Sequence, residues 1–172
     1  GHFAAVHGAW LTPKETDKAT IFDPETGEIL PSKKVLGSSA GAHIVLRDGG
    51  PAPRRLFLGE GIETVLSVAT ALKTTGALRP ADAFWSALSL GNLGGPHKGV
   101  TPHPTLKTEK GRAQNVPSDV PDFDDARAIA IPASVEELVL LGDGDSDPFL
   151  TALALARAVK RYARPGLSIR IA

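Results

Sequence analysis

The sequence predicts an α/β protein with a sheet of mainly parallel strands flanked by helices, preceded by a small β-rich segment. From residue 53 onward, short apolar runs typical of buried strands alternate with segments of helical periodicity, which is the order of a βαβ fold. Residues 1–50 instead carry strand and turn signals without a convincing helix. We therefore expect a β-rich segment at 1–50 and an α/β domain at 51–172.

The composition excludes several classes of protein. The 172 residues, 42% of them hydrophobic, suit one globular domain with a small appended piece. The formal net charge is zero, so any contact with nucleic acid must come from a local patch. The absence of cysteine excludes disulfides and cysteine-ligated metal sites. No apolar run approaches the roughly 18 residues of a membrane span, and no signal peptide is visible, so we expect a cytoplasmic protein without membrane contact.

The first 50 residues are predicted to be β-structure. The segment 18–30 indicates a hairpin whose turn is Asp23-Pro24-Glu25-Thr26-Gly27, and the glycines and proline at 49–51 indicate a boundary. Because the chain lacks methionine and begins with Gly1-His2-Phe3, we expect it to be a piece of a longer polypeptide.

The elements of the α/β domain follow from length and periodicity. Two short apolar runs, Arg55–Leu58 and Ala83–Leu88, enclose a segment that repeats apolar residues with helical spacing from Ile62 to Leu72. This order implies a right-handed parallel βαβ unit. Residues 96–125 lack apolar periodicity and are predicted to be a surface excursion. A short strand at 128–132, a strand ending at Leu141 and a final strand at 167–171 are also predicted. A helix is predicted to begin near Pro148, with a buried face of Ala152, Leu155, Val159 and Tyr162.

Three acids follow the strand that ends at Leu141: Asp143, Asp145 and Asp147. Alternate side chains of an extended chain point the same way, so extended geometry beyond the strand would bring these carboxylates together. Such a cluster favours a hard cation, Mg²⁺ or Mn²⁺. The alternative is a solvated turn that caps the next helix. An EF-hand loop is excluded, because Pro148 and Ala154 replace its required glycine and bidentate glutamate.

A second acid, Glu60, lies between a predicted strand and a predicted helix. Catalytic groups of open α/β sheets collect at the carboxyl ends of strands, near a switch in strand order. If the strands that begin near Arg55 and Leu138 are neighbours, Glu60 faces the aspartates. A glutamate beside a carboxylate-held divalent metal suits phosphoryl chemistry, whereas the simpler alternative is an acid that stabilises the helix dipole.

Both acidic sites lie in stretches that resemble the Toprim domain of bacterial-type primases, topoisomerases and OLD-type nucleases. The matching stretches are Leu56–Gly61 followed by a helix, and Leu138–Leu141 followed by Asp143 and Asp145. The segments Glu60–Ser67 and Ser89–Leu93 are most similar to the Toprim domain of phage- and plasmid-type primases and primase–helicases. The resemblance covers the chain from about residue 54 to its end.

The resemblance implies roles for the acids. Glu60 takes the place of the general acid/base, Asp143 and Asp145 that of the paired metal ligands, and Asp147 is an additional acid. The implied reaction is Mg²⁺- or Mn²⁺-dependent nucleotidyl transfer from nucleoside triphosphates on a single-stranded DNA template, with zinc-binding and helicase domains elsewhere in the polypeptide. The rivals are a nuclease that cleaves phosphodiesters and a catalytically silent module that binds nucleic acid or protein. A topoisomerase fits less well, because the only tyrosine, Tyr162, lies on a predicted core face.

Two further groups are candidate contacts to phosphate or nucleic acid. Asn92 lies in a glycine-rich stretch where backbone amides can approach a phosphate, with a plain tight turn as the alternative. A basic stripe on the last helix suits a nucleic-acid backbone, with a solvated helix face as the alternative. The stripe consists of Arg157, Lys160, Arg161 and Arg164. His97 and His103 have no partner pattern, and we expect them to be loop residues.

Overall fold

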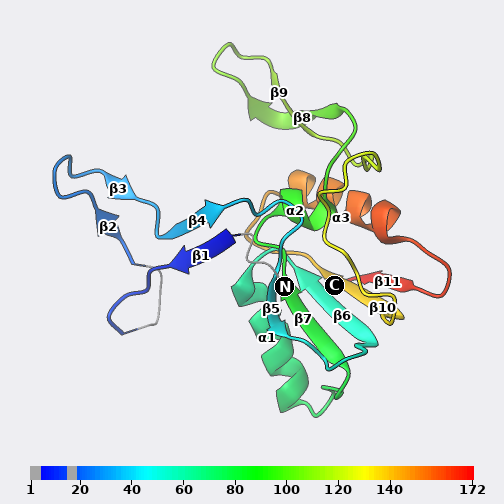
Figure 1. Cartoon of the computed structure of the whole chain (residues 1–172). Helices are drawn as coiled ribbons and strands as arrows, with labels where there is room; N and C mark the ends of the chain where they lie inside the picture. The colour runs from blue at the N-terminus through cyan, green and yellow to red at the C-terminus, as the bar shows by residue number, and fades with distance from the viewer. Residues whose placement is uncertain (1–4, 15–18) are drawn as a thin grey trace. The chain divides into compact units, whose positions relative to one another are not determined.

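The computed structural model describes residues 5–14 and 19–172 (Figure 1). Its contacts divide the chain into two compact units, residues 1–39 and 40–172. The boundary therefore falls before β5 (Ile44–Arg47), which belongs to the sheet of the second unit and not to the N-terminal β-rich segment. No helix within the described residues is long and apolar enough to cross a membrane.

The first unit consists of two short antiparallel ribbons. β1 (Ala5–Ala9) pairs with β4 (Lys33–Gly37), and β2 (Ile21–Phe22) pairs with β3 (Ile29–Leu30). The second pair confirms the predicted hairpin in its described part. The Asp23 carboxylate fixes its turn by accepting hydrogen bonds from the main-chain N–H groups of Glu25 at 2.8 Å and Thr26 at 3.0 Å. None of the described residues of this unit is buried, so these ribbons have no hydrophobic core of their own.

The second unit is a mixed α/β structure around a five-stranded, mainly parallel sheet with the strand order β11-β10-β6-β7-β5. The parallel strands are β6 (Arg55–Gly59), β7 (Asp82–Ser86), β10 (Glu137–Leu141) and β11 (Ser168–Ile171). β5 is antiparallel and pairs with β7 at one edge. The predicted α/β class and the parallel β6–helix–β7 unit are confirmed.

Helices cover both faces of this sheet (Figure 1). α1 (Ile62–Thr74) packs on one face, where Val65 meets Phe57 and Phe84. α2 (Leu90–Gly94) and α3 (Pro148–Tyr162) pack on the other face, over Leu56 and Leu58. Because adjacent residues of a strand point to opposite faces, the central strands are apolar at nearly every position, as the sequence shows.

The strand order reverses between β6 and β10. From β6 the chain crosses through α1 to β7 on one side, and it later returns to place β10 on the other side of β6. Chain connections therefore leave the carboxyl ends of β6 and β10 in opposite directions, and open α/β sheets bind their ligands in the crevice expected at such a switch point. The loops that follow these two strands contain Glu60 and the three aspartates.

Two sequence predictions about elements were wrong, and one element within the predicted excursion was not foreseen. The segment 96–125 contains an antiparallel hairpin of β8 (Val100–Lys107) and β9 (Ala113–Pro117), whose prolines hide the strand pattern. The segment 128–132 is not a strand, although Ile129 is buried in the core. In α3, Ala152 is exposed, because the helix turns a neighbouring face of small residues toward the sheet.

Candidate active site

The strands that precede the two acidic positions are direct neighbours. β6 and β10 pair in parallel, with Gly59 opposite Leu141. Glu60 therefore leaves the sheet beside the turn at 142–147, which we call the aspartate turn. The Ser146 hydroxyl donates a hydrogen bond to the Glu60 carboxylate at 3.1 Å. The expectation that these strands are neighbours is confirmed, and it brings Glu60 against the aspartate turn.

The main chain at Glu60 is held by the end of β7. The Glu60 carbonyl oxygen accepts hydrogen bonds from the buried Ser86 hydroxyl at 2.9 Å and from the Leu88 N–H at 2.8 Å. Leu88 has a φ of 70°, the only positive φ of a non-glycine residue in the part of the chain that the structure describes. A left-handed conformation costs such a residue about 1–2 kcal/mol, and strain of this kind is concentrated at functional sites.

Sequence reasoning missed Ser86 and Ser146 as positioning residues. Ser86 carried a signal, because it is a hydroxyl residue within an otherwise apolar strand end. Ser146 lies between two of the aspartates and had no distinguishing pattern.

The aspartate turn does not continue the extended geometry of β10. The Asp143 carboxylate accepts a hydrogen bond from the Asp145 N–H at 3.2 Å, and residues 144–146 form a turn. Asp147 caps α3 by accepting hydrogen bonds from the N–H groups of Phe149 at 2.9 Å and Leu150 at 3.0 Å. The expectation that the three carboxylates align was therefore wrong, because aspartate side chains bond to their own backbone in turns and caps. Within residues 5–14 and 19–172, no three His, Asp or Glu side chains are arranged as a metal-binding group.

Asp147 also connects this turn to the β8–β9 hairpin. The Nδ1 atom of buried His103 accepts a hydrogen bond from the Leu106 N–H at 2.9 Å, so Nε2 carries the proton and donates to the Asp147 carboxylate at 3.2 Å. The N–H of Leu150 and the His103 ring together lower the pKa of Asp147. The expectation that His103 is an unpartnered loop residue was wrong, and its partner lies too far along the chain for spacing to reveal it.

The carboxylates that follow β6 and β10 differ in charge pairing from most others of the second unit. Carboxylates elsewhere mostly pair with Lys or Arg: Asp82, Asp119, Asp122, Asp124, Asp125, Glu136 and Glu137. Glu60, Asp143 and Asp145 form no such pair among the described residues. Three uncompensated carboxylates near these two strand ends create a negative potential, and carboxylate oxygens are the kind of ligand that a hard divalent cation takes.

Asn92 serves the structure of the sheet edge. Its side-chain amide donates hydrogen bonds to the carbonyl oxygens of Ala42 at 2.6 Å and Ala87 at 2.8 Å, and its oxygen accepts one from the Gly41 N–H at 2.8 Å. Its own N–H bonds to the Ser89 hydroxyl at 3.2 Å, which caps α2. Because the main-chain N–H of Asn92 and both of its side-chain donors are used, none of them is left for a phosphate.

The basic stripe of α3 is largely turned inward. Arg157 is only 2% exposed and donates to the carbonyl oxygens of Gly95, at 3.0 Å, and Ser118. Arg161 and Arg164 likewise donate to main-chain carbonyls, and Lys160 pairs with Asp119. Arg157 is too buried to contact a nucleic-acid backbone, and the alternative of a solvated helix face was wrong, because these side chains fasten the segment 94–135 to the helix.

Comparisons of the chain with models of protein families, with curated proteins and with solved structures found no match.

Proposed function

We propose that the chain is the Toprim-type catalytic domain of a DNA primase-like protein, which performs Mg²⁺- or Mn²⁺-dependent nucleotidyl transfer for primer synthesis on single-stranded DNA. The observation that carries the proposal is the direct pairing of β6 with β10, which puts Glu60 and the Asp143–Asp147 turn at one switch point of the sheet. The sequence resemblance supplies the reaction class.

In this proposal Asp143 and Asp145 hold the cation, since both lie on the turn and neither pairs with Lys or Arg among the described residues. The bound cation neutralises the triphosphate and holds it in place. Glu60 accepts the proton of the attacking 3′ hydroxyl, while Ser146 orients its carboxylate. Asp147 is engaged as a helix cap, so we assign it to positioning the turn.

A catalytically silent binding module is the second candidate function. It is favoured by the geometry of the turn, in which Asp147 caps α3, Asp145 is exposed, and no three-ligand group is assembled among the residues described. A nuclease differs from a primase only in what the same acids do to the nucleic acid, so product analysis separates these two.

Metal binding separates the catalytic readings from the silent module. We expect 10 mM Mg²⁺ acting at a dissociation constant of about 1 mM to stabilise the wild type by about 1.4 kcal/mol, which raises the melting temperature by about 3–6 °C. Asp145→Asn should abolish this gain. Glu136→Gln, which removes a carboxylate at the opposite end of β10, should keep it. Equal responses of wild type and Asp145→Asn would contradict the metal site.

The reaction itself is tested by incubating the chain with single-stranded DNA, nucleoside triphosphates and Mg²⁺. Primer synthesis yields new labelled strands, and Glu60→Gln should reduce their rate at least a hundredfold, the usual contribution of a general base. Shortened DNA in place of new strands would identify the nuclease. Neither product, together with retained metal binding, would contradict catalysis by this chain.

A further inference from the structure

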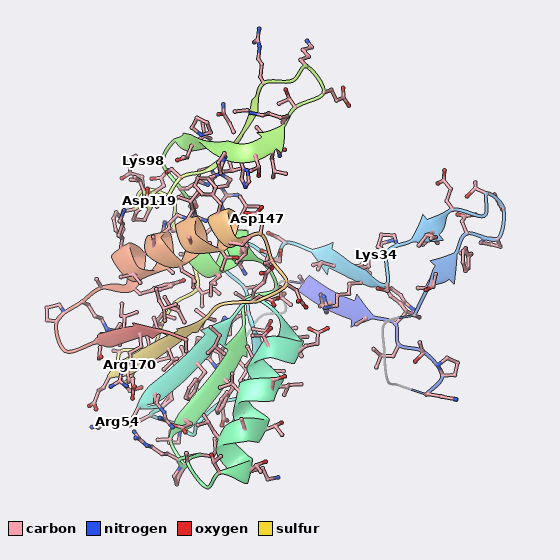
Figure 2. All side chains as sticks on the ribbon, turned by 180° about the vertical axis from the view of Figure 1, so that it is seen from behind. Lys34, Arg54, Lys98, Asp119, Asp147 and Arg170 are labelled. Atoms are coloured by element: carbon pink, nitrogen blue, oxygen red, sulfur yellow. The ribbon has the colours of Figure 1, made fainter. Side chains whose placement is uncertain are left out.

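The end of the β8–β9 hairpin nearest α3, which we call its foot, is bonded to the rest of the second unit. Figure 2 labels Lys98 and Asp119 at this foot and Asp147 where α3 begins. His103 is bonded to Asp147, Arg157 to the Ser118 carbonyl, and Lys160 to Asp119. The hairpin therefore starts directly beside the aspartate turn and projects beyond α2 and α3 (Figure 1).

The outer half of the hairpin is built differently from its foot. Every residue from 104 to 112 is exposed. The turn is nevertheless defined, because the Thr108 N–H donates to the Arg112 carbonyl at 2.8 Å and the Gly111 N–H donates to the Thr108 carbonyl at 2.8 Å. A positive φ of 75° at Gly111 suits this turn. Hydrogen bonds thus define the shape of the outer half, although none of its side chains is buried.

Three cations lie on this turn: Lys107, Lys110 and Arg112. Within the described residues none of them forms an ion pair, and one acid, Glu109, lies between them. Most other cations of the second unit are used internally. Ion pairs or carbonyl oxygens engage Arg47, Arg54, Arg55, Lys98, Arg127, Arg157, Lys160, Arg161, Arg164 and Arg170. Within the described residues, the second unit therefore displays three cations without an ion pair on the hairpin turn.

A polyanionic substrate such as a nucleic acid needs a local group of positive charges in order to bind near these carboxylates. The uncompensated carboxylates at the crevice repel phosphates, and the chain as a whole exerts no electrostatic attraction on a nucleic acid. From His103 to Lys107 the extended strand spans about 13 Å, which corresponds to roughly four nucleotides of a stacked, helical strand that rises about 3.4 Å per nucleotide. The cations thus lie within a few nucleotides of the aspartate turn.

We propose that the turn of the β8–β9 hairpin binds the phosphate backbone of a nucleic-acid strand and guides it to the acidic crevice, with Lys107, Lys110 and Arg112 as the contacts. The inference rests on the proposed function for the identity of the strand, which is single-stranded DNA. In this proposal the hairpin binds nucleic acid without sequence preference, because exposed lysines and arginines contact phosphates without reading bases.

The test compares two double variants of the full chain, matched in residue type and in exposure. Lys110→Ala/Arg112→Ala removes two cations of the turn, and Lys73→Ala/Arg79→Ala removes two exposed cations at the far end of α1 and the loop after it. Binding of a fluorescein-labelled oligothymidylate is followed by anisotropy in EDTA, at salt concentrations between about 50 and 200 mM. Circular dichroism checks that both variants fold.

Each lost phosphate contact to a single strand lowers the slope of log affinity against log salt by about 0.7. The hairpin variant should therefore lose about 1.4 from this slope and bind about 25-fold more weakly at about 0.1 M salt, while the α1 variant binds like the wild type. Equal affinities of the two variants, or no binding by the wild type up to roughly 100 µM, overturn the inference. Because EDTA removes divalent cations, this result does not depend on the proposed metal site, and each proposal fails separately.

Discussion

Replacing Arg157 with methionine removes a buried guanidinium that fastens α3 to two other segments. The Arg157 head donates to the carbonyl oxygen that ends α2 at Gly95 and to the Ser118 carbonyl at the hairpin foot. No carboxylate pairs with it among the described residues, and burial lowers its pKa. Methionine retains most of the side-chain volume, so the substitution tests the polar contacts rather than the packing.

The expected loss follows from these two hydrogen bonds. A hydrogen bond to a charged group contributes about 1.5–3 kcal/mol net, and a buried carbonyl left without a donor costs about 1–3 kcal/mol. Both bonds share one guanidinium whose desolvation is relieved by the change, so we take the low end of their sum, about 3 kcal/mol. At this chain length that loss lowers the melting temperature by about 6–12 °C.

Thermal unfolding measures the total loss, and amide hydrogen exchange locates it. We expect exchange to accelerate more in β8 and β9 than in β6 and β10, because the hairpin foot loses its buried contact. The matched control is Lys160→Met on the same helix, which breaks a half-exposed ion pair with Asp119 and should cost at most about 1 kcal/mol. Equal melting temperatures for the two variants would refute the structural role of Arg157.

Two further substitutions test the packing and the pH dependence. Gly94→Ala would place a Cβ 2.7 Å from the Arg157 Nη2 atom and should cost about 1–3 kcal/mol in a thermal melt; Gly91→Ala, whose Cβ meets only a hydroxyl at 3.9 Å, should change stability by less than about 1 kcal/mol. Burial raises the pKa of Asp82, but its hydrogen bonds from Arg55 and from a backbone N–H outweigh this and hold the pKa below its ordinary value. The resulting stabilisation is present above a pH of about 4 and disappears as pH falls through the folded pKa, so Asp82→Asn should flatten the acid side of the stability profile and destabilise the chain at neutral pH. If the stability of that variant decreased at acid pH as steeply as that of the wild type, the result would contradict a stabilising role of the Arg55–Asp82 pair.

The sheet could be predicted from the sequence because its signals are local. The apolar runs of β6, β7 and β10 and the helical spacing after Ile62 each identify an element without reference to the rest of the chain. The β8–β9 hairpin lacked such a signal, since Pro102 and Pro104 interrupt β8 and its outer residues are polar and exposed. An exposed hairpin has no buried face, and a buried face is what produces alternation in a sequence.

The site could be predicted in its location but not in its geometry. The two acidic motifs follow strands of one parallel sheet, and this was sufficient to bring Glu60 to the aspartate turn. The shape of the turn depends on which hydrogen bonds each aspartate makes, and the capping role of Asp147 outweighed the extended geometry. The contacts of His103 and Arg157 join segments far apart in the chain, and no spacing rule encodes them.

Paramagnetic Mn²⁺ titrated into the ¹⁵N-labelled chain tests whether the ends of β6 and β10 bind a divalent cation. We expect Mn²⁺ to broaden the amide resonances around Glu60 and residues 142–146 first. The broadening should disappear in an Asp143→Asn/Asp145→Asn variant and persist in Glu136→Gln. Broadening that is absent, or that begins at the acids of residues 122–125 and is insensitive to the double variant, would contradict a cation site at the ends of β6 and β10.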